Sequence, residues 1–116
     1  MMKLTGLWPI RLARISGESM APTYKSGELV LVRLFKGAAP RISPGNVVLI
    51  EREVMPGIFF IKRVTKIAGD SFWVQGDNKD PEVQNRMNDS QTWGFIRKEE
   101  IKGKLFFSRK INKLKN

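Results

Sequence analysis

The alternation of apolar and polar residues along the chain predicts short β-strands joined by turns. Runs rich in Val, Ile and Leu are each bounded by glycine-containing turns, such as residues 55–57. The expected strands cover residues 28–34, 46–53, 58–68, 71–76 and 104–111. Short strands with frequent turns are typical of mainly β domains, so we expect one compact, coiled or sandwich-like β domain over residues 1–116.

The segments between these runs predict little helix. Residues 77–92 are polar and lack apolar periodicity, so we expect a long loop there, and residues 98–101 fit one helical turn. One or two short helical turns are therefore the most that we expect. Residues 1–9 are expected to form a flexible or packing arm, and residues 112–116 a basic tail.

The apolar residues near the N-terminus, including Trp8, are interrupted by Pro9 and by basic residues. No window approaches the 18 or so consecutive apolar residues of a membrane span, so we expect no transmembrane helix in this chain. No small-residue cleavage site follows, which argues against a secretory signal. We therefore expect a location in the cytoplasm or at the periphery of a membrane, with Trp8 either packing on the domain or resting at a lipid interface.

The composition excludes several kinds of catalytic site. The 116 residues contain no cysteine and no histidine. A Ser-His-Asp triad, a thiolate nucleophile and a Cys/His zinc site are therefore impossible, and we expect neither metal nor cofactor. In an enzyme of this composition Lys, Asp or Glu must move the protons. The 21 basic and 11 acidic residues give a net charge of +10, which favours anionic partners or serves solubility.

A candidate nucleophile lies in the run ISGESMAPT, residues 15–23. The Ser19 hydroxyl stands between Gly17, which permits unusual backbone angles, and a Met-Ala-Pro-Thr turn. Such a turn could mount a nucleophile, but Ser beside Gly and Pro is also typical of an ordinary turn.

A candidate base lies in the longest expected strand. A period of two places Ile58, Phe60, Lys62 and Val64 on one face, which inserts one ammonium into an apolar row. To act as a base near neutrality, Lys62 needs a pKa about three units below 10.4, a difference of about 4 kcal/mol that burial can supply. The alternative is a lysine that extends its amine from a half-exposed strand into water.

Taken together, four motifs of this chain resemble the ordered boxes of the signal peptidase I family. They are SGESMAPTYKSGELVLV (16–32), IKRV with Gly69-Asp70, Gly76-Asp77-Asn78, and DSxxWGFI (89–96) followed by Ile101-x-Gly103. The resemblance implies a serine endopeptidase with a Ser/Lys dyad on a coiled β-sheet shared with LexA-like proteins. By the same resemblance Ser19 is the nucleophile, Lys62 the general base, and the backbone at Ser19 and Gly17 the oxyanion site.

The resemblance also implies residues that support the dyad. They are Met20, Pro22, Arg63, Asp70, Gly76, Asp77, Asn78, Asp89 and Ser90. Three positions depart from the family pattern: Gly17 replaces a hydroxyl residue, Met87 replaces a serine near the lysine, and Gln91 replaces an arginine that pairs with the aspartate. We therefore expect Asp89 to pair with Arg86 instead, and oxyanion stabilisation to rest on backbone groups.

Among compact relatives, the run GESMAPT and the box Gly69 to Asn78 are similar to nickel-type superoxide dismutase maturation proteases, which have no membrane anchor. That similarity implies a precursor protein with an N-terminal leader as the partner. The alternative peptidase is a shortened signal peptidase that acts at an anionic membrane surface.

Two other classes remain as alternatives. A LexA-like self-cleaving Ser/Lys domain shares the dyad, but no DNA-binding helices or Ala-Gly self-cleavage site precede Ser19. A basic β-barrel that binds nucleic acid would explain the charge and aromatic residues such as Trp73, but not the order of the boxes. We therefore expect no nucleic acid partner.

Overall fold

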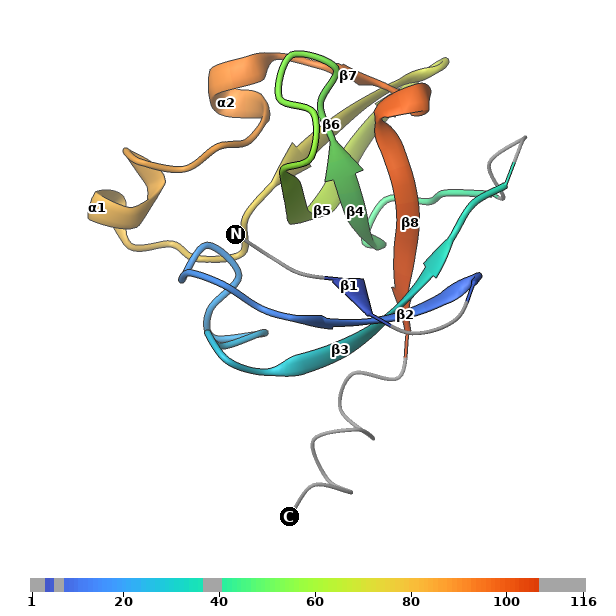
Figure 1. The fold of residues 1–116 in the computed structure, drawn as a ribbon. Coiled ribbons are helices and arrows are strands. Elements are labelled where there is room, and N and C mark those ends of the chain that lie inside the picture. Colours follow the sequence, from blue (N-terminus) through green and yellow to red (C-terminus); the bar gives the residue numbers. More distant parts are fainter. Residues whose placement is uncertain (1–3, 6–7, 37–40, 107–116) are drawn as a thin grey trace.

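The computed structural model describes residues 4–5, 8–36 and 41–106, and its strands form one antiparallel sheet (Figure 1). The strands are β1 (Leu4–Thr5), β2 (Ile10–Arg14), β3 (Leu29–Leu34), β4 (Val47–Glu51), β5 (Phe59–Ala68), β6 (Ser71–Gln75), β7 (Ile96–Arg97) and β8 (Ile101–Phe106). The helical turns are α1 (Pro81–Gln84), α2 (Ser90–Trp93) and the 3₁₀ turn η1 (Lys98–Glu100).

The sheet runs in the order β1-β2-β3-β8-β4-β5-β6-β7. It curls into a half-barrel in which β8 crosses from the β1 to β3 layer to the layer of β4 to β7 (Figure 1). The mainly β fold with only short helical turns is thereby confirmed. In the described part of the chain, no helix has both the length and the apolar character needed to span a membrane.

Two sequence expectations about individual elements are wrong. The last strand begins at Ile101 rather than at residue 104, and the expected residues 107–111 lie outside the described part, as does the tail 112–116. The segment 77–92 holds the helical turns α1 and α2. Each begins at an aspartate, Asp80 or Asp89, whose side chain accepts from the backbone two residues on. Capping, rather than apolar periodicity, therefore defines them.

The N-terminal stretch contributes strands to the sheet. Leu4 and Thr5 pair with Ala13 and Leu12 of β2, while the Trp8 side chain is half exposed. The arm expected over residues 1–9 is thus described only in part.

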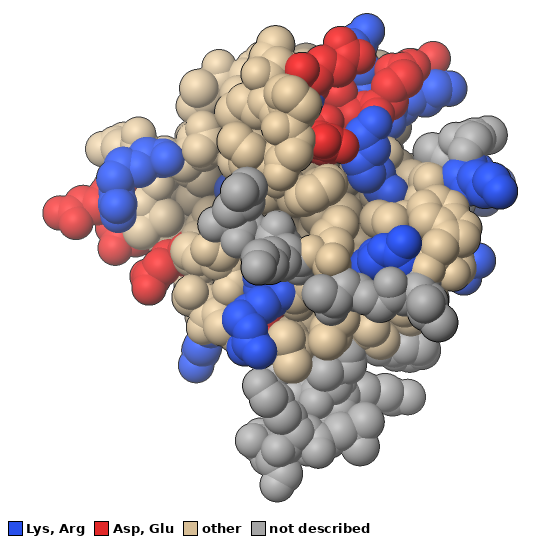
Figure 2. Space-filling view, in the orientation of Figure 1, with Lys and Arg blue, Asp and Glu red and all other residues tan. Residues whose placement is uncertain are grey.

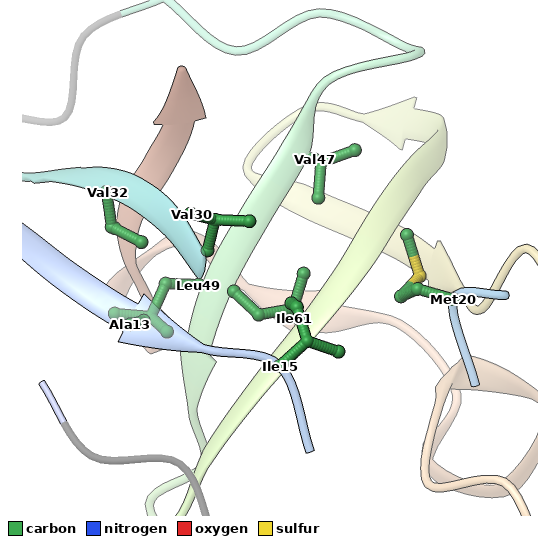
Figure 3. Close-up of a cluster of buried hydrophobic side chains, with 8 residues drawn as sticks. All are labelled: Ala13, Ile15, Met20, Val30, Val32, Val47, Leu49 and Ile61. Atoms are coloured by element: carbon green, nitrogen blue, oxygen red, sulfur yellow. The ribbon is translucent and has the colours of Figure 1, made fainter. Parts of the chain in front are cut away.

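Apolar residues gather on both faces of the curled sheet. One cluster contains Ala13, Ile15, Met20, Val30, Val32, Val47, Leu49 and Ile61 (Figure 3). The other contains Val48, Ile50, Val64, Phe72, Val74, Ile96 and Ile101. Neighbouring residues of one strand point to opposite faces, so β5 gives Ile61 to the first cluster and places Lys62 beside the second.

Candidate active site

The Ser19 loop leaves β2 and is held at both sides by buried side chains. Ile15 and Met20 both lie in the first apolar cluster, and Met20 is 1% exposed (Figure 3). Between them Gly17 has a φ of 87°, in the left-handed region that favours glycine. The backbone therefore turns at Gly17 and is fixed again at Met20, which holds the intervening Ser19 in a defined place.

The chain after β6 clamps this loop from the other side. The backbone N–H of Asn78 donates to the Ser19 carbonyl at 2.9 Å, and the Asn78 side chain donates to the Glu18 carbonyl at 2.8 Å. Gly76 lies against the same loop: a Cβ added there would be 2.5 Å from the Ser19 carbonyl oxygen and 2.4 Å from the Met87 sulfur. Only glycine fits this close approach of the two chains.

A bidentate ion pair fixes the same segment to β5. Arg63 donates from Nε and Nη2 to the two oxygens of Asp77, at 2.8 and 2.7 Å, and from Nη1 to the Gly45 carbonyl. Burial by itself would raise the pKa of Asp77, but hydrogen bonds from Arg63 and from the Thr23 hydroxyl hold it below its ordinary value. Asp77 thus joins β5 to the turn that follows Ser19.

Lys62 is buried in the middle of β5, with 3% of its surface exposed. Desolvation by its apolar surroundings lowers the pKa of Lys62 from 10.5 to about 8, and the nearby Asp89 carboxylate opposes part of that shift. The alternative prediction from the sequence, that Lys62 extends its amine into water, is therefore wrong. Arg63 next to it, on the other face of the strand, is half-buried in its ion pair.

The helical turn α2 fixes Asp89 near Lys62. Asp89 is buried and accepts from the Gln91 N–H at 3.0 Å and from the Gly76 N–H at 3.3 Å. The hydroxyl of buried Ser90 accepts from the Val74 N–H at 2.8 Å. The expected Asp89–Arg86 ion pair is wrong within the described residues, because the Arg86 Nε donates instead to the carbonyl of Glu82, one turn earlier.

Ser19 and Lys62 line one cleft of about 440 Å³. Its other lining residues are Ile15, Ser16, Met20, Ile58, Phe59, Phe60 and Ile61. Among the described residues, no strand pairs with the edge of β5 that lines the cleft, since β6 pairs with β5 only from Arg63 onward. The Val64 N–H donates to the Asn46 carbonyl just before β4, and the Val64 carbonyl accepts from the Gly45 N–H. In an antiparallel ladder such bonds involve every second residue, so the N–H and C=O groups of Phe59 and Ile61 point away from β4, toward the cleft.

The cleft thus brings together the Ser19 residue, a buried lysine of lowered pKa and part of β5. A family profile described as signal peptidase, peptidase S26, matches residues 4–80, about two thirds of the chain. The chain belongs to the signal peptidase family. That membership implies a serine-type peptidase that acts on protein substrates, and the match includes Ser19, Lys62 and the Gly76-Asp77-Asn78 box. No curated protein matches the chain.

Of the family motif residues, Ser19, Met20 and Lys62 line the cleft. Gly76 and Asn78 contact the Ser19 loop, whereas Asp70 lies elsewhere. Asp70 is exposed in the turn between β5 and β6, where it lies 4.0 Å from the Lys98 amine. Eight residues separate it from Lys62, roughly 25 Å along an extended strand. Pro22 is exposed after a cis peptide bond in the Ser19 loop. No group of three or more acidic residues that could hold a metal ion occurs within the described ranges.

Two contacts of the signal peptidase site had no specific signal in the sequence. Thr23 binds Asp77, and Met87 packs against Gly76. Thr23 belongs to the Ser19 motif and could have been selected for its hydroxyl. Met87 stands where the resemblance leads one to expect a hydroxyl, so its packing role required coordinates.

We expect Asp77→Asn to lower the free energy of unfolding by about 1–2 kcal/mol at pH 7, because Arg63 loses its charged partner. The pKa of Asp77 is lower in the folded state, so its contribution is present above the unfolded pKa and is lost as pH falls through the folded value. Urea unfolding at pH 7 and at about pH 2.5 measures this. An equal difference between variant and wild type at both pH values would contradict the role given to the ion pair.

Proposed function

We propose that this chain is a serine endopeptidase in which Ser19 and Lys62 form the catalytic dyad and remove a leader from a precursor protein. The observation that carries the proposal is the shared cleft, which is lined both by Ser19 and by a buried lysine of lowered pKa. Family membership supports the reaction class, and the absence of histidine from the sequence requires another base.

Burial gives Lys62 a usable neutral fraction. With a pKa of about 8, about a tenth of the amine is neutral at pH 7, roughly 300-fold more than at a pKa of 10.5. In the proposed reaction the neutral amine takes the Ser19 proton as the hydroxyl oxygen attacks the scissile carbonyl carbon. The proton then passes to the leaving amine as the C–N bond breaks. Lys62 next takes a proton from water as the water oxygen attacks the acyl-Ser19 carbonyl carbon. It returns that proton to the Ser19 oxygen as the C–O bond breaks, which releases the new carboxyl terminus and restores the neutral amine.

The free edge of β5 provides a way to hold the substrate. An extended peptide laid beside residues 59–61 can exchange main-chain hydrogen bonds with Phe59 and Ile61, as an added strand does. Its side chains would meet the apolar wall that includes Ile15 and Ile58. In the proposed complex the scissile bond lies between Ser19 and Lys62, which line the same cleft.

The Ser19 loop offers one backbone donor for the developing oxyanion. Within the described residues, the Ser19 N–H has no hydrogen-bond partner, and Gly17 carries no side chain to shield the loop. We assign the oxyanion site to the Ser19 N–H, with Gly17 shaping the approach to it. A preorganised backbone donor of this kind typically contributes about 3 kcal/mol to catalysis.

For the substrate we propose the leader of a nickel-type superoxide dismutase precursor. This rests on the similarity of the GESMAPT run and of residues 69–78 to the maturation proteases of that enzyme. Incubating the purified chain with such a precursor and reading the new N-terminus by mass spectrometry tests it. A single cut at the leader junction is expected. Cleavage of general secretory signal peptides, but not of this precursor, would instead favour a shortened signal peptidase.

The pH dependence of cleavage tests the role of Lys62. Because the reactive form is the neutral amine, kcat/KM should rise about tenfold per pH unit from pH 6 and level above a pKa of about 8. The initial rates of peptide cleavage between pH 6 and 10 measure it. A flat profile, or a limb centred near 10.5, would remove Lys62 from the role of base.

A further inference from the structure

A second hollow of about 440 Å³ lies between β3 and β8, apart from the cleft. Its lining residues are Arg33, Phe35, Lys104, Leu105 and Phe106. None of these residues lines the Ser19 cleft. Its volume falls in the range of small-molecule sites, about 300–1,000 Å³.

Two cations lie side by side at this hollow, which covers one face of the paired strands β3 and β8. Arg33 and Lys104 are directly opposite in the antiparallel ladder, which places their Cβ atoms about 5 Å apart. Like charges in such a pair destabilise a sheet. Neither side chain forms an ion pair with any residue in the described ranges. The sheet thus holds two adjacent positive charges that nothing described neutralises.

The surroundings strengthen this positive field. The strands β2, β3 and β8 carry no carboxylate and, besides Arg33 and Lys104, carry Arg14 and Lys102. Arg11 of β2 is opposite Val32 and therefore points to the other face of the sheet. Figure 2 shows the acidic side chains elsewhere, at the top over β7 and η1 and at the left near α1. An anion is therefore drawn to the face of β3 and β8 rather than to the acidic end of the molecule.

Apolar side chains flank the two cations. Leu31 is opposite Phe106 in the ladder, and alternation along β3 puts Leu31, Arg33 and Phe35 on one face. Phe35 also packs against the second apolar cluster, so the wall of the hollow continues into the core. A ligand that fits must combine an anionic head with an apolar body.

We propose that the hollow between β3 and β8 binds one amphiphilic anion, a carboxylate or phosphate on an apolar tail, with its head between Arg33 and Lys104. The tail lies against Phe35 and Phe106. A free fatty acid and an anionic lipid share this chemistry. The site is separate from the dyad, so its occupancy does not depend on Ser19.

Isothermal titration calorimetry with decanoate tests the proposal. We expect one decanoate per chain, and Arg33→Gln/Lys104→Gln should raise its Kd at least about tenfold, because two charged partners of the head are lost. Lys66→Gln/Lys98→Gln removes the same net charge at the other end of the sheet and should change Kd less than about twofold. Ser19→Ala should bind decanoate like the wild type.

Further probes distinguish the sources of such an anion. Inorganic phosphate and decyl maltoside should both bind more weakly than decanoate, because phosphate has no apolar tail and decyl maltoside has no anionic head. Phosphatidylglycerol vesicles that compete with decanoate indicate a membrane lipid as the source, while decanoate binding unaffected by vesicles indicates a free acid. Either outcome of the vesicle competition supports the proposed site.

Three results would overturn the proposal: no heat with decanoate, equal loss of affinity in the two double variants, or binding of vesicles or single-stranded oligonucleotides without decanoate binding. The Arg33→Gln/Lys104→Gln variant should fold with an unchanged or higher Tm, because a repulsive pair is removed. It should also cleave precursor at the wild-type rate, which separates this site from the proposed peptidase function.

Discussion

Ser19→Ala and Lys62→Met should each reduce precursor cleavage at least ~10³-fold, the largest effects expected for this chain. The first removes the attacking oxygen, and the second removes the amine that accepts its proton. Because the two groups act as one unit, the double variant should be no slower than either single variant. Single-turnover cleavage of a leader-bearing precursor, followed by mass spectrometry, measures all three. Retained cleavage by either single variant would contradict the dyad.

Stability measurements on Lys62→Met distinguish a chemical from a structural cause of lost cleavage. The pKa of Lys62 is lower in the folded state, so between pH 8 and 10.5 the folded protein binds fewer protons and wild-type stability rises with pH. Below pH 8 the buried ammonium costs about 3 kcal/mol. Lys62→Met should therefore be more stable than the wild type at pH 7, by an amount that shrinks toward pH 10. A destabilised, inactive Lys62→Met variant would leave a structural explanation open.

Gly76→Ala should reduce cleavage by about 10² or more, although Gly76 has no reacting group. Its new Cβ would stand 2.5 Å from the Ser19 carbonyl oxygen, so the loop that carries the nucleophile must move. Misplacement by about 1 Å is enough for a loss of this size. Overpacking should also lower the free energy of unfolding by about 1–3 kcal/mol. Steady-state kinetics and urea unfolding give the two values.

Gly103→Ala provides a matched control for that prediction. A Cβ at Gly103 in β8 would be 2.7 Å from the Arg33 carbonyl oxygen, which is also too close to backbone but lies away from the cleft. This variant should lose similar stability and keep most of its kcat. Equal losses of kcat in both glycine variants would mean that general destabilisation, rather than the position of Ser19, explains the effect.

The strands could be predicted because their signal is local. The Val-rich and Ile-rich runs at residues 28–34 and 58–68 became β3 and β5 nearly as expected, since β-branched residues and flanking glycines act within a few residues. The period of two also placed Lys62 beside an apolar cluster. It could not show whether the amine is covered, because the covering groups come from other segments of the chain.

The site itself depends on contacts that are distant in sequence. Asn78 meets Glu18 and Ser19 across some sixty residues, and the pairing of Arg63 with Asp77 depends on how β6 leaves the sheet. The helical turns α1 and α2 were missed because one capping aspartate defines each, with no apolar stripe. The free edge of β5 exists only because β6 stops pairing at Arg63, which no local pattern indicates.

The proposed catalytic role of Lys62 depends on the pKa of its amine. Heteronuclear NMR of the lysine side chains, with Lys62→Met used to assign the signal, measures it in the Ser19→Ala variant without self-digestion. One lysine signal should titrate at about pH 8 and be missing from the spectrum of Lys62→Met. A Lys62 signal that titrates near 10.5 with the bulk of the lysines would contradict that role.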